Sequence, residues 1–327
     1  LGLIESETGF RNPNENYGQL TKIKATDSFL QKLLKITDPM IQDVSPPELV
    51  ILKNRNDKKN IDYRDSKKII NIRDSLKEYN ILRQQSVFNL SNLTNDEISA
   101  KKRYLDLFSI GCHNEGEILL RNPYIYRVFN NNFLYGGRYY NGIESNMPKT
   151  LRSKLKINNN ETIELDYSCL HIQMLYNLEG LQLKQNAYDQ LAGDDNILRA
   201  IYKLIGLVSI NANNIKSALN GIRNEIREID YYKILPDLSD KSLMPMYQRW
   251  IDEHKPISKY FNSDIGIKLQ YYDSVIAAGI IKYFTEKSIS VLVIHDSFVI
   301  EKKYKDELLD IMNSEYKKKF KFEPNIK

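Results

Sequence analysis

The sequence has few cysteines and no long hydrophobic run, and each absence excludes a class of protein. Among its 327 residues are two cysteines, Cys112 and Cys169, too few for a disulfide framework and typical of a reducing compartment. No second ligand pair lies at zinc spacing from Cys112 and His113, so we expect no structural zinc site. No stretch approaches the roughly 18 apolar residues that span a bilayer, and no signal peptide is visible. We therefore expect no membrane partner. The expected location is the cytoplasm, which includes the nucleoid and the interior of a phage-infected cell.

The overall composition is that of a folded chain with a mild excess of positive charge. Hydrophobic residues make up 42% and charged residues 27%, which predicts a sizeable core rather than disorder. The net charge of +5 is compatible with an anionic partner, and an ordinary lysine-rich surface explains it equally well.

Hydrophobic spacing predicts an α+β fold without internal repeats. The polar residues 1–18 predict a flexible arm, and residues 19–120 predict a mostly helical N-terminal subdomain. Within that subdomain we expect a short strand at Leu49–Leu52 and helices at the following ranges: Gln19–Ile36, Asp65–Gln85 and Asp96–Phe108.

The rest of the chain predicts strands that carry functional residues, separated by helices. Residues 121–184 predict a strand that feeds directly into a helix, and residues 185–262 predict helices with breaks near Gly193 and Pro236. Residues 263–327 predict, in order, a helix at Tyr271–Phe284, a hairpin at Val291–Ile300 and a helix at Lys305–Phe320.

Two isolated carboxylates occupy strand ends in this pattern. Asp296 lies at the tip of the predicted hairpin, and Asp166 follows the apolar strand that begins at Ile163. A single aspartate at a hairpin tip is usually only a turn residue. Two carboxylates on adjacent strands, however, are the minimum that holds a pair of divalent metals for in-line phosphoryl transfer.

Further motifs accompany the two carboxylates in a fixed order. In chain order they are Gly137-Arg138, Asn146-Met147-Pro148 with Arg152, Asp166-Tyr167-Ser168, Arg199 and Lys203 one helical turn apart, Leu269-Gln270, and His295-Asp296-Ser297-Phe298. From about Gly136 to Phe320 this order resembles the family A polymerases, which comprise bacterial-repair-type DNA polymerases and single-subunit phage and mitochondrial RNA polymerases. The resemblance implies a right-hand fold with a small antiparallel-sheet palm (121–184 and 263–327), helical fingers (185–262) and a helical thumb (19–120).

The resemblance also implies roles for individual residues. Asp166, Asp296 and the backbone carbonyl of Tyr167 would bind two Mg²⁺ ions, with Mn²⁺ as an alternative. Arg199 and Lys203 would bind the nucleoside triphosphate, and Lys203 would protonate the leaving pyrophosphate. Tyr167 and His171 would lie at the incoming nucleotide. The residues expected to contact a DNA or RNA primer-template are Arg138, Arg152, Gln270 and His295.

Each of these residues also has a purely structural interpretation. Asp166 could simply end a strand, and Arg199 with Lys203 could form a solvated helix face. Arg138 could pack against the neighbouring tyrosines. His113 and His254 have no partner pattern, and we interpret both as structural.

The sequence departs from the family at the positions that test the base and the sugar. Leu207 replaces the aromatic residue that stacks on the incoming base, and Asn211-Ala212 replaces Tyr-Gly. His171 occupies a position where bulk would crowd a 2′-hydroxyl, which favours deoxynucleotides. Ser297-Phe298, in contrast, is the form found in the RNA polymerases.

The sequence thus predicts a compact template-dependent DNA polymerase. The residues before Gly136 are too few for an exonuclease in addition to a thumb, and they hold no acidic exonuclease cluster, so we expect no proofreading. Alternatives are a single-subunit RNA polymerase or primase, an untemplated terminal transferase, and a catalytically inactive nucleic-acid-binding protein on the same scaffold.

Overall fold

The computed structural model describes residues 4–7, 10–12, 17–19, 22–26, 47–112, 117–228 and 237–327. The chain forms two compact units, residues 1–46 and residues 47–327. In the first unit two antiparallel pairs are described, β1 with β4 and β2 with β3. The strands are β1 (Ile4–Glu7), β2 (Phe10–Asn12), β3 (Tyr17–Gln19) and β4 (Lys22–Ala25).

These strands correct the sequence prediction for the N-terminus. The expected flexible arm contains paired strands, and part of the expected helix at Gln19–Ile36 is strand β4. Lys22–Ala25 alternates polar and apolar side chains, and this period of two suits a strand rather than a helix. The other residues of the expected helix, apart from Gln19 and Thr26, lie outside the described residues.

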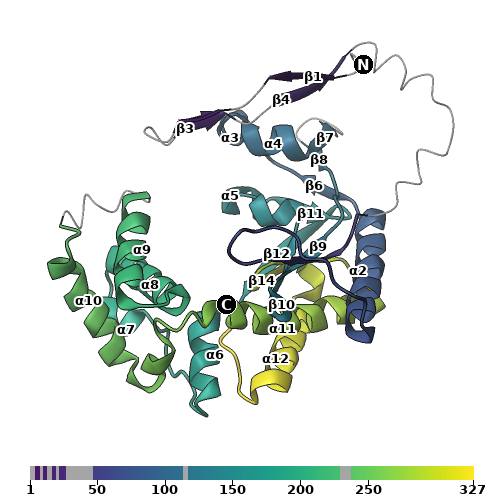
Figure 1. Cartoon of the computed structure of the whole chain (residues 1–327). Coiled ribbons are helices and arrows are strands. Elements are labelled where there is room, and N and C mark those ends of the chain that lie inside the picture. The colour runs from purple at the N-terminus through teal and green to yellow at the C-terminus, as the bar shows by residue number, and fades with distance from the viewer. Residues whose placement is uncertain are drawn as a thin grey trace. The chain divides into compact units, whose positions relative to one another are not determined.

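The second unit contains a seven-stranded antiparallel sheet with the order β13-β14-β12-β11-β6-β8-β7. Its strands are β6 (Phe88–Leu90), β7 (Ser109–Cys112), β8 (Ile118–Leu120), β11 (Leu155–Ile157), β12 (Asn160–Asp166), β13 (Val291–Ile294) and β14 (Ser297–Glu301). The predicted strand before Asp166 and the predicted hairpin are therefore both present, and they are direct neighbours (Figure 1).

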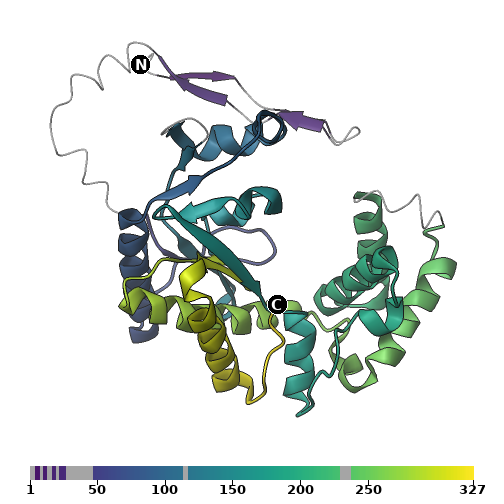
Figure 2. The same cartoon turned by 180° about the vertical axis from the view of Figure 1, so that it is seen from behind.

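A smaller sheet, with the order β10-β9-β5, completes the strands of this unit. It consists of β5 (Val50–Lys53), β9 (Tyr126–Asn130) and β10 (Asn132–Tyr140), with β5 parallel to β9. The long helix α11 (Gly266–Glu286) packs against β10 and also contacts α2 (Lys67–Gln85). The two views in Figures 1 and 2 show α2 and α11 beside these strands.

Apart from α5, the remaining helices agree with the predicted helical regions. Gly193 ends α7 at a positive φ of 58°, in agreement with the helix break predicted near this residue. Pro236, where the second break is predicted, lies outside the described residues. The predicted helix at Asp96–Phe108 is two helices divided at Lys101. The helices are α3 (Asn95–Ala100), α4 (Lys102–Phe108), α5 (Lys149–Arg152), α6 (Leu170–Leu178), α7 (Asp189–Ala192), α8 (Asn196–Asn211), α9 (Ile215–Glu228), α10 (Asp240–Glu253) and α12 (Lys305–Phe320), with 3₁₀ turns at Ile143–Asn146, Lys255–Tyr260 and Lys302–Tyr304.

The N-terminal part of this unit differs from the expected helical subdomain. Strands β6, β7 and β8 belong to the same sheet as the two aspartate strands, and the boundary between the compact units lies at Pro46–Pro47 rather than near residue 120. The observed helices and mainly antiparallel strand pairs agree with the predicted α+β class.

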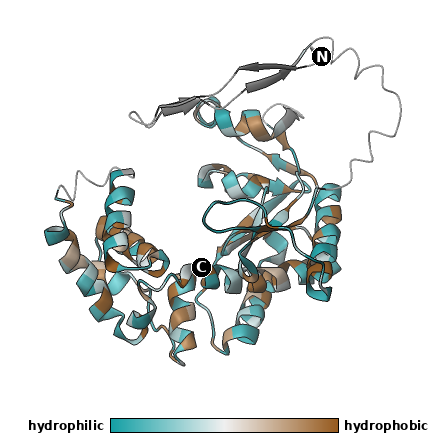
Figure 3. Ribbon diagram, viewed as in Figure 1, coloured by the Kyte–Doolittle hydropathy of each residue, from teal (hydrophilic) through white to brown (hydrophobic). Residues whose placement is uncertain are grey.

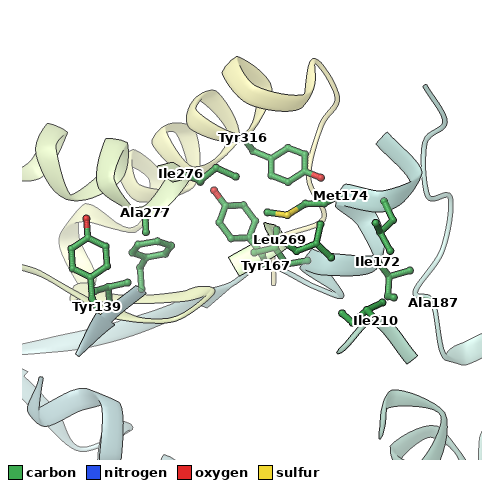
Figure 4. Packing of buried hydrophobic residues seen from close by; sticks show 14 of the residues in the cluster. Tyr139, Tyr167, Ile172, Met174, Ala187, Ile210, Leu269, Ile276, Ala277 and Tyr316 are labelled. Atoms are coloured by element: carbon green, nitrogen blue, oxygen red, sulfur yellow. The ribbon is translucent and has the colours of Figure 1, made fainter. Parts of the chain in front are cut away.

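Strand β14 is buried on both faces, which explains its unbroken hydrophobic run. Phe298 and Ile300 belong to the main hydrophobic core, whereas Val299 between them belongs to a second core with Leu292. Because successive strand residues point to opposite faces, each face of β14 contributes to a different core. Figure 4 shows the main core where Tyr167, which follows β12, and residues of α6 and α11 lie near Tyr316 of α12.

The described helices are amphipathic rather than uniformly apolar. Figure 3 shows hydrophilic and hydrophobic residues interleaved along them. Within the described ranges, none of the helices combines the length and the apolar character that crossing a bilayer requires.

Candidate active site

The two predicted carboxylates lie at one end of adjacent strands. Asp166, the last residue of β12, is the register partner of Ser297, the first residue of β14, and Asp296 precedes Ser297 in the hairpin turn. The backbone N–H of Tyr167 donates to the carbonyl of Asp296 at 3.1 Å, which fixes the two strand ends together. The pairing across the sheet therefore brings Asp166 and Asp296 to the same place.

The environment of Asp166 is that of a carboxylate facing a like charge. Burial and the charge of Asp296 raise the pKa of Asp166 to about 6, and Lys327 opposes this rise. Asp166 keeps 32% of its side chain exposed, so a ligand can reach it from solvent. Perturbed carboxylates in a cavity are typical of functional sites.

A cavity of about 260 Å³ opens beside the two aspartates. It gathers every residue that the sequence predicted for the site except Arg152: Arg138, Asp166, Tyr167, His171, Arg199, Lys203, Gln270, His295 and Asp296. These residues come from both sheets, from α6, α8 and α11, and from the hairpin turn, so tertiary folding assembles the cavity.

Helix α8 supplies the two cations. Arg199 pairs with Asp189 at 2.6 Å and lies over the ring of Tyr188. Lys203 is exposed and forms no ion pair with any other described residue, so its ammonium group is available to an anion. Leu207 follows one turn later and is 53% exposed.

Close packing against α10 fixes the position of α8. A Cβ atom on Gly206 would lie 2.8 Å from the indole ring of Trp250, so only glycine allows this approach. Helix α8, which lines the cavity, is thereby packed closely against Trp250 of α10.

Arg138 and His171 line the cavity, and both contact the buried carboxylate of Asp273. The Nη2 of Arg138 lies 2.5 Å, and the Nε2 of His171 lies 3.0 Å, from the Oδ2 of Asp273. Burial alone would lower the pKa of Arg138, but the charges of Asp273 and Asp296 raise it above its ordinary value. Burial and the charge of Arg138 lower the pKa of His295.

The glycine before Arg138 is required by this geometry. Gly137 has a φ of 83°, and a Cβ there would lie 2.6 Å from the ring of Phe129 and 2.9 Å from the Oγ of Ser274. Since Ser274 is on α11, Gly137 lets β10 approach that helix closely. The close approach brings the guanidinium group of Arg138 into contact with the carboxylate of Asp273.

Arg152, a predicted primer-template contact, does not line this cavity. Its guanidinium group contacts Glu164, with Nε 3.1 Å from Oε2, and Nη1 donates to the carbonyl of Met147 at 2.9 Å. Glu164 in turn accepts a hydrogen bond from the hydroxyl of Ser297 at 2.9 Å. Arg152 is therefore placed to support the hairpin through Glu164, and it does not line the cavity.

Sequence reasoning missed two charged residues of the site, Asp273 and Lys327. Asp273 lies three residues after Gln270 on the same helix, a spacing that places both on one face and could have indicated it. Lys327 lines the cavity with its Nζ 3.5 Å from the Oδ2 of Asp166. No periodic pattern marks Lys327, because its approach depends on a segment without regular structure.

The donor set at the two aspartates fits hard divalent cations. The described residues contain no group of three or more His, Cys, Asp or Glu side chains arranged to hold a metal. The available donors are the carboxylates of Asp166 and Asp296 with the backbone carbonyl of Tyr167. Oxygen donors of this kind suit Mg²⁺, which is commonly bound through one or two carboxylates together with substrate phosphates.

Comparisons with known proteins identify no relative of the chain, so the function of the site is inferred from its chemistry. No known protein-family model matches the chain, and no curated protein matches it either.

Proposed function

We propose that the chain is a nucleotidyltransferase that extends a nucleic-acid strand, in its simplest form a compact template-dependent DNA polymerase of the family A type without proofreading. The pairing of β12 with β14 carries this proposal, because it brings Asp166 and Asp296 to a cavity that α8 lines with Arg199 and Lys203. The two carboxylates suit metal ions that bind a triphosphate, and the two cationic side chains suit the phosphates themselves.

The chain's own residues have distinct roles in this proposal. Asp166, Asp296 and the Tyr167 carbonyl would hold two Mg²⁺ or Mn²⁺ ions, which supply charge stabilisation for the transferring phosphoryl group. Lys203 binds the triphosphate and donates a proton to the leaving pyrophosphate, and Arg199 binds beside it. His171 limits the room at the sugar.

Arg138, Gln270 and His295 line the wall of the cavity near Asp296 and would contact the primer-template. In this proposal, residues 121–184 and 263–327 form the palm, and residues 185–262 form the fingers.

Three alternatives rest on two particular observations. The Ser297-Phe298 pair after Asp296 favours a single-subunit RNA polymerase or primase. The exposed Leu207, in place of a base-stacking aromatic residue, favours a nucleic-acid-binding protein without catalysis or a terminal transferase that ignores the template.

A primed-template extension assay distinguishes these functions. The protein is incubated with Mg²⁺ or Mn²⁺ and with either deoxynucleotides or ribonucleotides, and the product is sequenced against a defined template. Asp166→Asn and Asp296→Asn are each expected to reduce incorporation about 10³-fold or more. Asp310→Asn on the exposed side of α12 is the matched control. Nucleic-acid binding without incorporation by the unmodified protein would reject the enzymatic proposal.

A further inference from the structure

We propose that Lys327 is an internal counter-ion of the carboxylate pair, which a divalent cation must displace from Asp166. This inference rests on the proposed function, because it takes Asp166 and Asp296 as the metal-binding residues. It adds a residue of the site that regulates access of the metal.

The segment Asn325–Lys327 lies against the end of β12 as an additional antiparallel partner. The N–H of Asp166 donates to the carbonyl of Lys327, and the N–H of Lys327 donates to the carbonyl of Asp166, both at 3.0 Å. The N–H of Ser168 donates to the carbonyl of Asn325 at 2.7 Å, and Tyr167 bridges to Ile326. These reciprocal backbone bonds bring Lys327 beside Asp166 whatever its side chain does.

A buried amide holds the segment in place. Gln173 of α6 is 0% exposed, its Nε2 donates to the carbonyl of Glu323 at 3.1 Å, and its Oε1 accepts from the N–H of Asn325 at 3.2 Å. A buried amide is costly without hydrogen-bond partners, and both of its polar atoms find them in this segment. The position of the C-terminal segment beside Asp166 is therefore fixed by the hydrogen bonds of this buried amide and is not a chance contact.

The Lys327 side chain itself is free to move. It is 66% exposed, and its ammonium group lies 3.5 Å from Asp166, while none of the backbone hydrogen bonds of the pairing depends on it. An ammonium group and a divalent cation compete for the same carboxylate oxygen, since both bind through its negative charge. In the absence of metal the ammonium group offsets the repulsion between the two aspartates, and on metal binding it swings into solvent.

The proposal predicts that removing the charge of Lys327 strengthens metal binding and weakens the stability of the metal-free protein. Lys327→Met should tighten Mn²⁺ binding on the order of two- to fivefold, the equivalent of an exposed ion pair, and should lower the urea midpoint of the metal-free protein in EDTA. Lys327→Arg retains the charge and should resemble the unmodified protein in both measurements. Lys305→Met is the matched control, because it removes the same charge from an exposed lysine outside the cavity.

Mn²⁺ titration by calorimetry at low ionic strength, with Asp166→Asn as a further variant, separates the outcomes. Unchanged or weaker Mn²⁺ binding by Lys327→Met, or an equal change in Lys305→Met or Lys327→Arg, overturns the inference. If Asp166→Asn abolishes Mn²⁺ binding in the same experiment, the proposed function still stands. If Asp166→Asn binds Mn²⁺ like the unmodified protein, or if no variant binds it, both proposals fail together.

Discussion

The Nε2 atom of His171 lies 3.0 Å from the Oδ2 atom of Asp273, a carboxylate on α11 that is only 3% exposed. The same oxygen accepts from Arg138, so side chains from α6, α11 and β10 meet at this carboxylate beside the cavity. The imidazole is therefore held in a defined place, as a residue that limits the space around a sugar must be.

Substitution of His171 tests its proposed role in sugar choice. His171→Gly should increase the ratio of ribonucleotide to deoxynucleotide incorporation about tenfold or more, because it opens space for a 2′-hydroxyl. The measurement is kcat/KM for each nucleotide on a primed template. His171→Gln keeps the bulk and should retain the preference of the unmodified protein. An unchanged ratio in His171→Gly would reject the steric role.

The two cations of α8 should contribute unequally. Lys203 is exposed without an ion-pair partner among the described residues, whereas Arg199 is paired with Asp189. Lys203→Ala should therefore reduce kcat/KM for nucleotide incorporation about 10²-fold, and Arg199→Ala should cost less. Lys216→Ala on the exposed side of α9 serves as the control. Equal losses for Lys203→Ala and Lys216→Ala would show that only general charge matters.

His254 should make folding stability depend on pH. Burial lowers the pKa of His254 to about 4, and its ring contacts Tyr176 and the carbonyl of Ala187. As the pH falls below about 6.5, His254 becomes protonated in the unfolded chain but stays neutral in the folded chain. The stability that the neutral His254 contributes is therefore fully present above about pH 6.5 and is lost toward pH 4.

Urea unfolding between pH 7.5 and 4.5 measures this effect. The contribution of His254 amounts to about 3 kcal/mol over the full window. His254→Asn removes the titrating group and should give a flatter profile, even if the variant is less stable throughout. Parallel profiles for the two proteins would contradict the assignment.

The buried ion pair of Arg83 and Glu144 should contribute more to stability than an exposed ion pair does. Both side chains are fully buried, and Nη1 and Nη2 of Arg83 lie 3.0 and 3.1 Å from the two carboxylate oxygens of Glu144. Glu144→Gln leaves a buried charge without compensation and should lower the free energy of unfolding by about 3–5 kcal/mol. Asp74→Asn breaks the exposed pair with Lys77 and should cost about 0–1 kcal/mol. Similar urea midpoints for the two variants would contradict this ranking.

Local sequence pattern was sufficient for the elements that carry the two aspartates. The apolar run before Asp166, the two-residue turn at His295-Asp296 and the helical spacing of Lys305–Phe320 each depend on neighbours a few residues apart. The pattern failed at Lys22–Ala25, where a short alternating strand lies inside a window that also fits a helical stripe. It also could not show that β6–β8 join the sheet of β12 and β14, because strand pairing is a long-range choice.

The sequence by itself thus determined which residue types lie at the ends of β12 and in the β13–β14 turn, and in which order they occur. Only the tertiary structure decided which side chains meet. It brought Asp273 onto Arg138 and His171, placed Lys327 beside Asp166, and directed Arg152 to Glu164 instead of the cavity. The physical reason is that charges at close range select partners by distance and burial, and these depend on how strands and helices far apart in the chain pack together.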